Sequence, residues 1–358
     1  MKSGLWKGLF YLVLLPAAIG VSGWQGWAWW SWATSPVESP LTDKPTIAAQ
    51  RIQIQIPQGT PAQQIGQDLE SAGLIRSAAA WRFWTRWKAF QDPEGGFKAG
   101  VYALSPTQTL AEIADQIWLG DVVQLSFTIP EGWSRKQMAE ALEAKGFFSA
   151  SEFMNASSKI PVNQHPWLPQ TLPHLEGFLY PDTYQLPAER ITPEAVVFQM
   201  LKRFEEEAFS LYQQQSDMSL LEWVTLASIV EKEAVIPEER GVIAGVFTNR
   251  LDNDIPLGAD PTVEYGLGIE QTPEQPLTWD QVNTPSPYNT YINAGLPPTP
   301  IASPGQASLE AALNPEKTDY LYFVARYDGT HVFSRTLAEH EAAQADIRDR
   351  IDSQGSQQ

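Results

Sequence analysis

A long stretch near the N-terminus places the strongest constraint on the fold, because it carries no charge. Residues 8–37 contain no Asp, Glu, Lys or Arg, the run from Leu9 to Val21 is strongly apolar, and Lys2 and Lys7 precede it. A membrane-spanning helix needs about 20 mostly apolar residues, and positively charged flanks stay in the cytoplasm. We therefore expect residues 1–32 to be a cytoplasmic stub and a transmembrane helix, with the remainder on the outer, periplasmic side.

Tryptophans follow the apolar run and would form its interfacial belt. They are Trp24, Trp27, Trp29, Trp30 and Trp32. A cleaved signal peptide is the alternative, although a tryptophan-rich segment is a poor cleavage region, which needs small residues. Residues 33–48 are rich in Pro, Ser and Thr and predict a stiff, extended linker.

Composition excludes several classes of function. The net charge of -18 argues against a nucleic-acid-binding surface, which needs a basic stripe. The chain has no cysteine, so disulfides and thiolate metal sites are absent, and its four histidines form no HxxxH or HxH pair. We therefore expect neither a metal nor a cofactor.

A repeated pattern organises the region after the linker. Ile56-Pro57-Gln58-Gly59 recurs as Ile129-Pro130-Glu131-Gly132, and each copy is followed by apolar residues at helical spacing and then by a glycine. Alternation over residues 52–56 predicts a half-buried strand, and residues 100–104 and 109–119 repeat the order of strand and helix. Residues 49–150 are thus predicted to form an α+β module, which is more typical of a binding or spacing element than of an enzyme.

The most conspicuous segment of that module is Trp81-Arg82-Phe83-Trp84-Thr85-Arg86-Trp87-Lys88. Aromatic residues at helical spacing usually belong to a core, while cations extend into solvent. The alternative is a patch that stacks on sugars or lies on a membrane surface.

The candidate catalytic acid is Glu176, in the stretch from Leu175 to Tyr184. Its neighbours are apolar and aromatic, and a carboxyl group that loses hydration has a raised pKa and can donate a proton near neutral pH. A Glu before a Gly is also common in solvated turns, so the stretch alone leaves both interpretations open.

A second carboxylate stands out on a predicted helix. A helix from Thr192-Pro193 to about residue 213 is followed by a second one, which opens with the capping box at Ser219 and continues through Ala234. Glu231 falls in the middle of its apolar face, whereas Glu222 and Glu233 are expected to be solvated. Glu231 would line a site or accept hydrogen bonds from loop amides.

The loops that follow suit a sugar polymer. Asp260-Pro261 fits a helix N-cap with a first-turn proline. Residues 286–298 interleave aromatic, amide and hydroxyl side chains with prolines, and pyranose rings stack on Tyr while their hydroxyls pair with Asn and Thr. An ordinary surface loop is the alternative. No GxSxG, P-loop, HExxH or dinucleotide motif is present, so carboxylate acid/base chemistry remains.

Several motifs together resemble one family, the endolytic murein transglycosylases or YceG-like proteins. The matching segments, in order, are residues 175–177 with 180–184, 227–233, 246–251, 260–263 with 265–266, 288–291 with 295–298, and 320–324. The resemblance covers roughly residues 50–345 and the N-terminal span.

The resemblance implies an α+β protein with a transmembrane helix, a LysM-like module at 49–150, a YceG-like catalytic domain at 151–348 and a polar tail at 349–358. Such a lyase cleaves the MurNAc–GlcNAc bond within nascent peptidoglycan and leaves 1,6-anhydroMurNAc ends. The catalytic Glu of the family corresponds to Glu176, and cell-wall synthases are candidate partners. Secondary sugar-binding candidates are Tyr180, Asp182, Glu231, Asn249, Asp260, Tyr288, Asn289 and Thr290.

One acid suffices for this chemistry because the attacking hydroxyl belongs to the substrate, whereas hydrolytic glycosidases use two carboxylates. Two alternatives remain at this level. The first is a non-enzymatic peptidoglycan-binding scaffold of the elongation machinery. The second is a hydrolase that pairs Glu176 with Glu231 and produces reducing ends.

Overall fold

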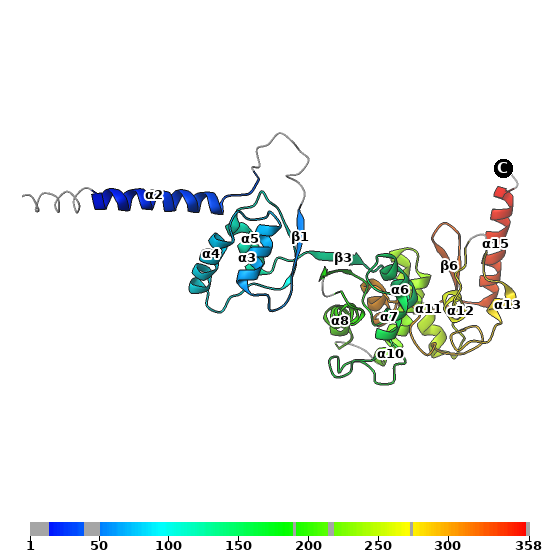
Figure 1. The fold of residues 1–358 in the computed structure, drawn as a ribbon. Coiled ribbons are helices and arrows are strands. Elements are labelled where there is room, and N and C mark those ends of the chain that lie inside the picture. The colour runs from blue at the N-terminus through cyan, green and yellow to red at the C-terminus, as the bar shows by residue number, and fades with distance from the viewer. Residues whose placement is uncertain (1–13, 39–50, 189–190, 214–217, 273–274, 356–358) are drawn as a thin grey trace, which may run out of the picture. The chain divides into compact units, whose positions relative to one another are not determined.

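The structure is a computed structural model that describes residues 14–38, 51–188, 191–213, 218–272 and 275–355. The chain forms two compact units, which are described separately (Figure 1). The first comprises residues 1–125 and 185–190, and the second comprises residues 126–184 and 191–358. The second copy of the sequence repeat therefore lies in the second unit. The sequence instead predicts the boundary between the module and the catalytic domain at residue 150.

The first unit begins with helix α2 (Leu15–Thr34). No helix within the described ranges combines the length and the apolar character that a membrane crossing requires. The later part of α2 contains Gly, Ser, Gln and Trp, which are less hydropathic than Leu, Ile and Val. The predicted transmembrane helix is therefore not found among these residues, and the first part of the predicted apolar run lies outside them.

The rest of the first unit is an α+β module. Its elements are β1 (Ile52–Ile56), α3 (Ala62–Ser71), α4 (Ala78–Gln91), β2 (Gly100–Leu104) and α5 (Leu110–Leu119). The alternating sequence of β1 forms a strand that pairs antiparallel with β2, from Ile52 opposite Leu104 to Ile56 opposite Gly100. The predicted strands and the helix α5, capped by Thr109, are confirmed. The LysM-like identity of this module remains a prediction.

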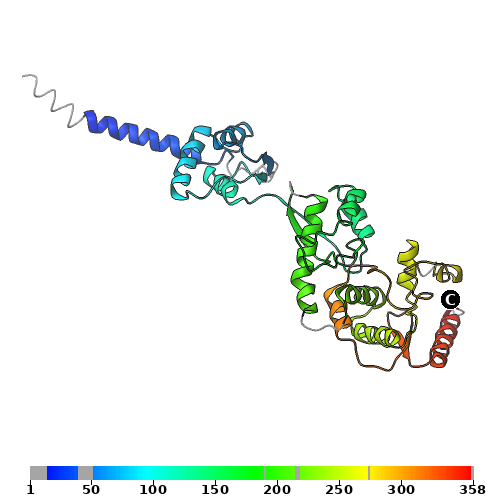
Figure 2. The ribbon, with the colours of Figure 1, turned by 90° about the horizontal axis from the view of Figure 1, so that it is seen from below.

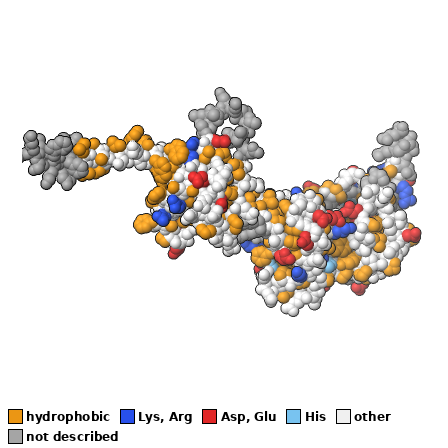
Figure 3. Space-filling model, viewed as in Figure 1, with side chains coloured by type: hydrophobic (Ala, Val, Ile, Leu, Met, Phe, Trp, Pro, Cys, Tyr) orange, Lys and Arg blue, Asp and Glu red, His pale blue; other side chains and the backbone are white. Residues whose placement is uncertain are grey.

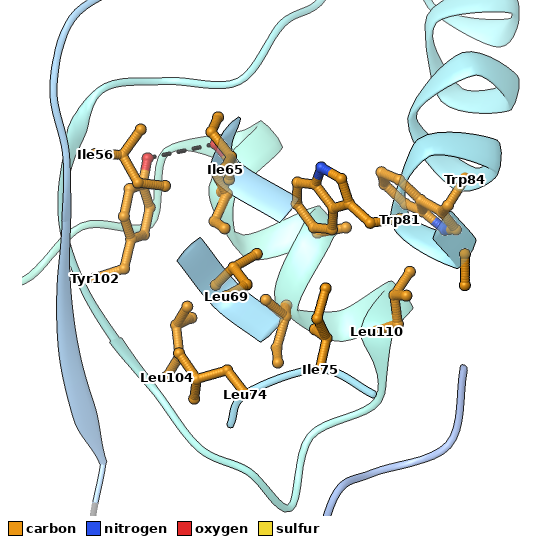
Figure 4. Packing of buried hydrophobic residues seen from close by; sticks show 14 of the residues in the cluster. Ile56, Ile65, Leu69, Leu74, Ile75, Trp81, Trp84, Tyr102, Leu104 and Leu110 are labelled. Carbon is orange, nitrogen blue, oxygen red and sulfur yellow. Dashed lines mark hydrogen bonds between the residues drawn. The ribbon is translucent and has the colours of Figure 1, made fainter. Parts of the chain in front are cut away.

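Part of the aromatic segment on α4 is buried in the core of the first unit. Trp81 and Trp84 pack against Ile65, Leu69 and other apolar side chains from both strands and all three helices of the module (Figure 4). Gly66 is required beside Trp81, because a Cβ at this position would collide with the indole ring. The prediction of core packing is thus correct for Trp81 and Trp84, but Phe83 and Trp87 are exposed.

The second unit repeats the order of strand, two helices and strand. These elements are β3 (Gln124–Thr128), α6 (Arg135–Ala144), α7 (Ala150–Ala156) and β4 (Thr183–Pro187). Residues 124–125 of β3 and 185–187 of β4 are counted with the first unit. The amide of Ile129 donates to Asp182 O, and the amide of Ala188 donates to Val123 O, so the strands run antiparallel. A long connection between α7 and β4 carries Glu176.

A helical layer follows. It contains α8 (Pro193–Phe204), the π-helix η3 (Glu205–Phe209), α9 (Ser210–Tyr212), α10 (Leu220–Glu233), the 3-10 helix η4 (Pro237–Glu239), α11 (Arg240–Asp252), α12 (Asp260–Leu267), α13 (Trp279–Val282), α14 (Gln306–Leu313) and α15 (Leu337–Gly355). Strands β5 (Tyr322–Ala325) and β6 (His331–Ser334) pair antiparallel beside α15.

Helix α10 is the centre of the second unit. The capping box at Ser219 that starts it is confirmed. The helix lies among the other helices of the unit and packs against α11, α12 and α14 (Figure 2). Every residue from Trp223 to Val230 is buried. The sequence predicted a helix with one apolar face, but this part of α10 is buried on all sides. Thr225 and Ser228 can be buried there because their hydroxyls donate to carbonyls of their own helix.

Candidate functional site

Glu176 is buried in the second unit, with 2% of its surface exposed. Its Oε1 accepts a hydrogen bond of 2.9 Å from the backbone amide of Arg135, and its Oε2 accepts one of 2.9 Å from the hydroxyl of Tyr265. These donors come from α6 and α12, which lie far apart in the sequence. The interpretation of Glu176 as a solvated turn residue is therefore wrong.

The environment of this carboxyl favours its protonated form. Burial removes water from the carboxylate and raises the pKa of Glu176 to about 7, although the donors on Arg135 and Tyr265 oppose the shift. A carboxyl group with this pKa is present as both acid and base near neutral pH. It can donate a proton and take one back within a single reaction.

Helix α6 places one donor by its N-terminus. Ser134 caps the helix, and Arg135 follows at the first position, where a backbone amide has no partner within the helix. The Arg135 side chain is buried and donates to Ser157 Oγ, Ser158 Oγ and Met154 O at the end of α7. These bonds hold the start of α6 against α7, so that the amide points at Glu176.

Gly177 fixes the backbone beside the acid. Its φ of 81° lies in the left-handed region, where non-glycine residues are strained. A Cβ at this position would also collide with Pro300 and contact Val224. A glycine is therefore needed for the chain to turn here with Glu176 facing inward.

Glu176 lines a cleft of about 670 Å³, which is large enough for a sugar unit. Its wall comes from α6 and the turn before it, the ends of α7 and α10, the connection that carries Glu176, α12, and the loops that contain Gly268, Tyr288 and Ile301. The lining residues are Gly132, Ser134, Arg135, Lys136, Gln137, Glu140, Met154, His174, Glu176, Lys232, Pro261, Glu264, Tyr265, Gly268, Ile269, Glu270, Tyr288 and Ile301.

The cleft mixes charged and aromatic groups. Lys136 and Lys232 face it together with Glu264, whose pKa burial raises. Burial and the charge of Arg135 lower the pKa of His174 to about 4, so this imidazole is neutral at pH 7 and accepts from the amide of Glu176. The Tyr265 ring meets the edge of Tyr288, with centroids 4.8 Å apart.

Tyr288 is the predicted secondary residue that shares this cleft with Glu176. Its hydroxyl lies 2.9 Å from Thr299 Oγ1. Asn289 and Thr290, which follow it, are buried. Asn289 Nδ2 donates to the carbonyls of Val282 and Thr284, and Thr290 Oγ1 accepts from the amide of Ala259. These two side chains shape the loop that carries Tyr288.

Tyr180 and Asp182 do not line the cleft. Tyr180 is buried with its ring edge toward Phe204. Asp182 forms an ion pair of 2.6 Å with Arg203. Both residues therefore join the connection before β4 to α8.

Glu231 is half-buried and structural. It accepts a hydrogen bond of 2.6 Å from Ser308 Oγ and one of 3.2 Å from the amide of Gly305, which tie α10 to the start of α14. The prediction that Glu233 is solvated is wrong. Burial, together with the charges of Asp260 and Glu264, raises the pKa of Glu233 to about 8.

Asn249 and Asp260 also make structural contacts. Asn249 Nδ2 donates to the carbonyls of Thr318 and Tyr320, which bind the end of α11 to the segment before β5. Asp260 begins α12 without capping it, so that prediction is wrong. Its carboxylate is turned instead toward the hydroxyl of Tyr291, which donates to Oδ1 at 2.6 Å.

Three residues that form hydrogen bonds with Glu176 were not named as candidates from the sequence. They are Arg135, His174 and Tyr265. Arg135 was hidden because its backbone amide, rather than its side chain, contacts Glu176. Tyr265 belongs to one of the motifs that match the family. Its position in a helix that starts near Pro261 does not indicate that it contacts Glu176, which lies 89 residues away. Among the described residues, no group of three His, Cys, Asp or Glu side chains could hold a metal ion.

Comparison with known proteins identifies the family. The YceG-like family pattern matches residues 54–346. The chain belongs to the YceG-like family. An endolytic murein transglycosylase of Bacillus subtilis is 33% identical over 82% of this chain and 83% of the relative. One of Streptococcus pneumoniae is 32% identical over 81% of this chain and 58% of the relative.

A solved structure agrees with this membership. The crystal structure of a yceG-like protein from Listeria monocytogenes is 34% identical in sequence, with a TM-score of 0.55 over 82% of this chain and 99% of that one. The mixed α+β YceG-like fold predicted from the sequence is thereby confirmed, since both the fold and the family pattern extend across both units.

We predict that Glu176→Gln changes the pH dependence of stability. The folded pKa of about 7 lies above the usual 4.5, so the carboxyl destabilises the fold progressively as pH rises from about 4.5 to about 7. An amide cannot ionise. The variant should therefore match the wild type at pH 4 and exceed it by roughly 3 kcal/mol at pH 8, as measured by urea unfolding. An identical pH dependence in both proteins would contradict the burial of an ionisable Glu176.

Proposed function

We propose that the chain is a lytic transglycosylase that cleaves the MurNAc–GlcNAc bond within nascent peptidoglycan strands and leaves 1,6-anhydroMurNAc ends. The observation that carries the proposal is Glu176, a buried acid with a pKa of about 7 in the wall of a cleft. The names of the relatives support the reaction class.

The first step is proton donation. Glu176 protonates the glycosidic oxygen, the bond from MurNAc C1 to that oxygen breaks, and positive charge develops at C1. The carboxylate that remains accepts from the amide of Arg135 and the hydroxyl of Tyr265. Both donors stabilise the charged form that remains once the proton has been transferred.

The second step closes the sugar on itself. The C6 hydroxyl of the same MurNAc attacks C1, and its proton passes to the Glu176 carboxylate, which regenerates the acid. No water is consumed. The Tyr265 hydroxyl can donate to the carboxylate and, after rotation, accept from the acid, so it serves both states of Glu176.

The two alternative functions, a non-enzymatic scaffold and a hydrolase with two carboxylates, place different requirements on the site. A binding scaffold has no use for a protonated carboxyl in its cleft. A hydrolase with Glu176 and Glu231 as a pair needs Glu231 free to act, whereas its carboxylate is bound to Ser308 and Gly305. The geometry therefore favours the single-acid route.

We predict that Glu176→Gln lowers the release of anhydromuropeptides from purified glycan strands at least about 100-fold, the usual contribution of general acid–base catalysis. Glu231→Gln is the matched control, because its amide oxygen can still accept from Ser308. It should keep near wild-type activity. The products are weighed by mass spectrometry, since anhydro ends are one water lighter than reducing ends. Reducing ends, or equal activity of Glu176→Gln and wild type, would contradict the proposal.

We also propose that the N-terminal segment holds the chain at the outer face of the cell membrane. The uncharged residues 8–37 after Lys2 and Lys7 support this location, as do the exposed tryptophans of α2.

The location predicts that the full chain stays with the membrane fraction after carbonate extraction. In spheroplasts, externally added protease should digest it. Release by carbonate, or protection from external protease, would contradict this location.

A further inference from the structure

The outer face of α4 exposes three large aromatic side chains. Phe83, Trp87 and Phe90 are 59%, 55% and 85% exposed. Their spacing of four and three residues places them on one side of the helix, turned away from the buried Trp81 and Trp84. Aromatic side chains that gather on one exposed face mark an interaction surface.

The same face is positively charged in an acidic protein. The helix contains Arg82, Arg86 and Lys88 but no Asp or Glu, whereas the whole chain has a net charge of -18. Lys88 is paired with Asp115 at 2.7 Å, and both arginines are exposed. Between residues 82 and 90, every exposed position is an aromatic residue, an arginine or Ala89.

Helix α4 contacts α2 within the first unit. Ala33 of α2 is fully buried in the core of that unit, and α2 contacts α4 and α5. The Arg76 guanidinium lies 5.8 Å from the centre of the Trp32 ring and donates to the carbonyls of Pro36 and Val37. The end of α2 is thus tied to the rest of the unit, and hydrophobic side chains lie along α2 and on the adjoining side of the unit, among other residues (Figure 3).

We propose that this face of α4, which consists of Arg82, Phe83, Arg86, Trp87 and Phe90, docks on a lipid surface with anionic headgroups. Aromatic rings partition into the interface between water and hydrocarbon, and arginines pair with lipid phosphates while their stems cover apolar surface. A sugar site would require amide or hydroxyl groups around the rings, and this face offers rings and guanidinium groups. The contact would orient the first unit on the membrane.

The test uses the absence of cysteine from the chain. Single cysteines replace Phe83 or Phe90 in the full-length protein, and Gln67→Cys on the exposed side of α3 is the control. Each variant is labelled at its cysteine with an environment-sensitive fluorophore. The labelled protein is then bound to vesicles that contain nitroxide-labelled lipid. We expect strong quenching at positions 83 and 90 in phosphatidylglycerol vesicles, weak quenching there in phosphatidylcholine vesicles, and little at position 67 in either.

The charge is tested by Arg82→Gln with Arg86→Gln in the labelled Phe90→Cys protein. Each arginine near an anionic surface strengthens the contact about fivefold, so the double variant should lose most of its quenching. Quenching at positions 83 and 90 no greater than at position 67 would overturn the proposal. Protection of these labels by soluble glycan strands, without quenching by lipid, would assign the face to sugar instead. The α4 face belongs to the first unit and the cleft to the second. The lyase assay therefore tests the proposed reaction independently of lipid binding by α4.

Discussion

The site depends on the burial of one carboxyl group between two donors. Glu176 accepts from the first amide of α6 and from the Tyr265 hydroxyl of α12. Without those donors the carboxylate would be too costly to form in a buried position, and without burial the acid would be too weakly populated at neutral pH. The pKa of about 7 reflects the balance of the two effects. The contacts of Arg135 with α7 and the left-handed turn at Gly177 serve to keep this arrangement in place.

The two copies of the repeat differ in the connection that carries Glu176. Both copies form a strand, two helices and an antiparallel partner strand. In the first copy, residues 92–99 connect the second helix to the second strand. In the second copy, residues 157–182 make this connection, and they include Glu176. The longer connection places Gly177 beside Val224 of α10 and Glu176 beside Tyr265 of α12, whereas the first copy has a closed core around Trp81.

Local features of the fold could be predicted from the sequence. The alternation of residues 52–56, the capping box at Ser219 and the motif around Glu176 each depend on neighbours within a few residues. Contacts between distant segments could not be predicted in this way. The partner of Tyr265 lies 89 residues away, and the hydrogen bonds of Glu231 reach Ser308, 77 residues away. The helical wheel of α10 misplaced Glu233 for the same reason, because α12 brings Asp260 and Glu264 close to the side that was expected to face solvent.

The titration of Glu176 itself tests most directly whether this residue is the proton donor. Carbon-13 NMR of the Glu side-chain carboxyl carbons, with the Glu176→Gln variant to assign the signal, would follow its ionisation in the free wild-type protein. We expect a midpoint near pH 7, the value to which burial raises the pKa of this carboxyl. A midpoint near the ordinary 4.5 would contradict it, because Glu176 would then be ionised at neutral pH and could not donate the proton that starts the reaction.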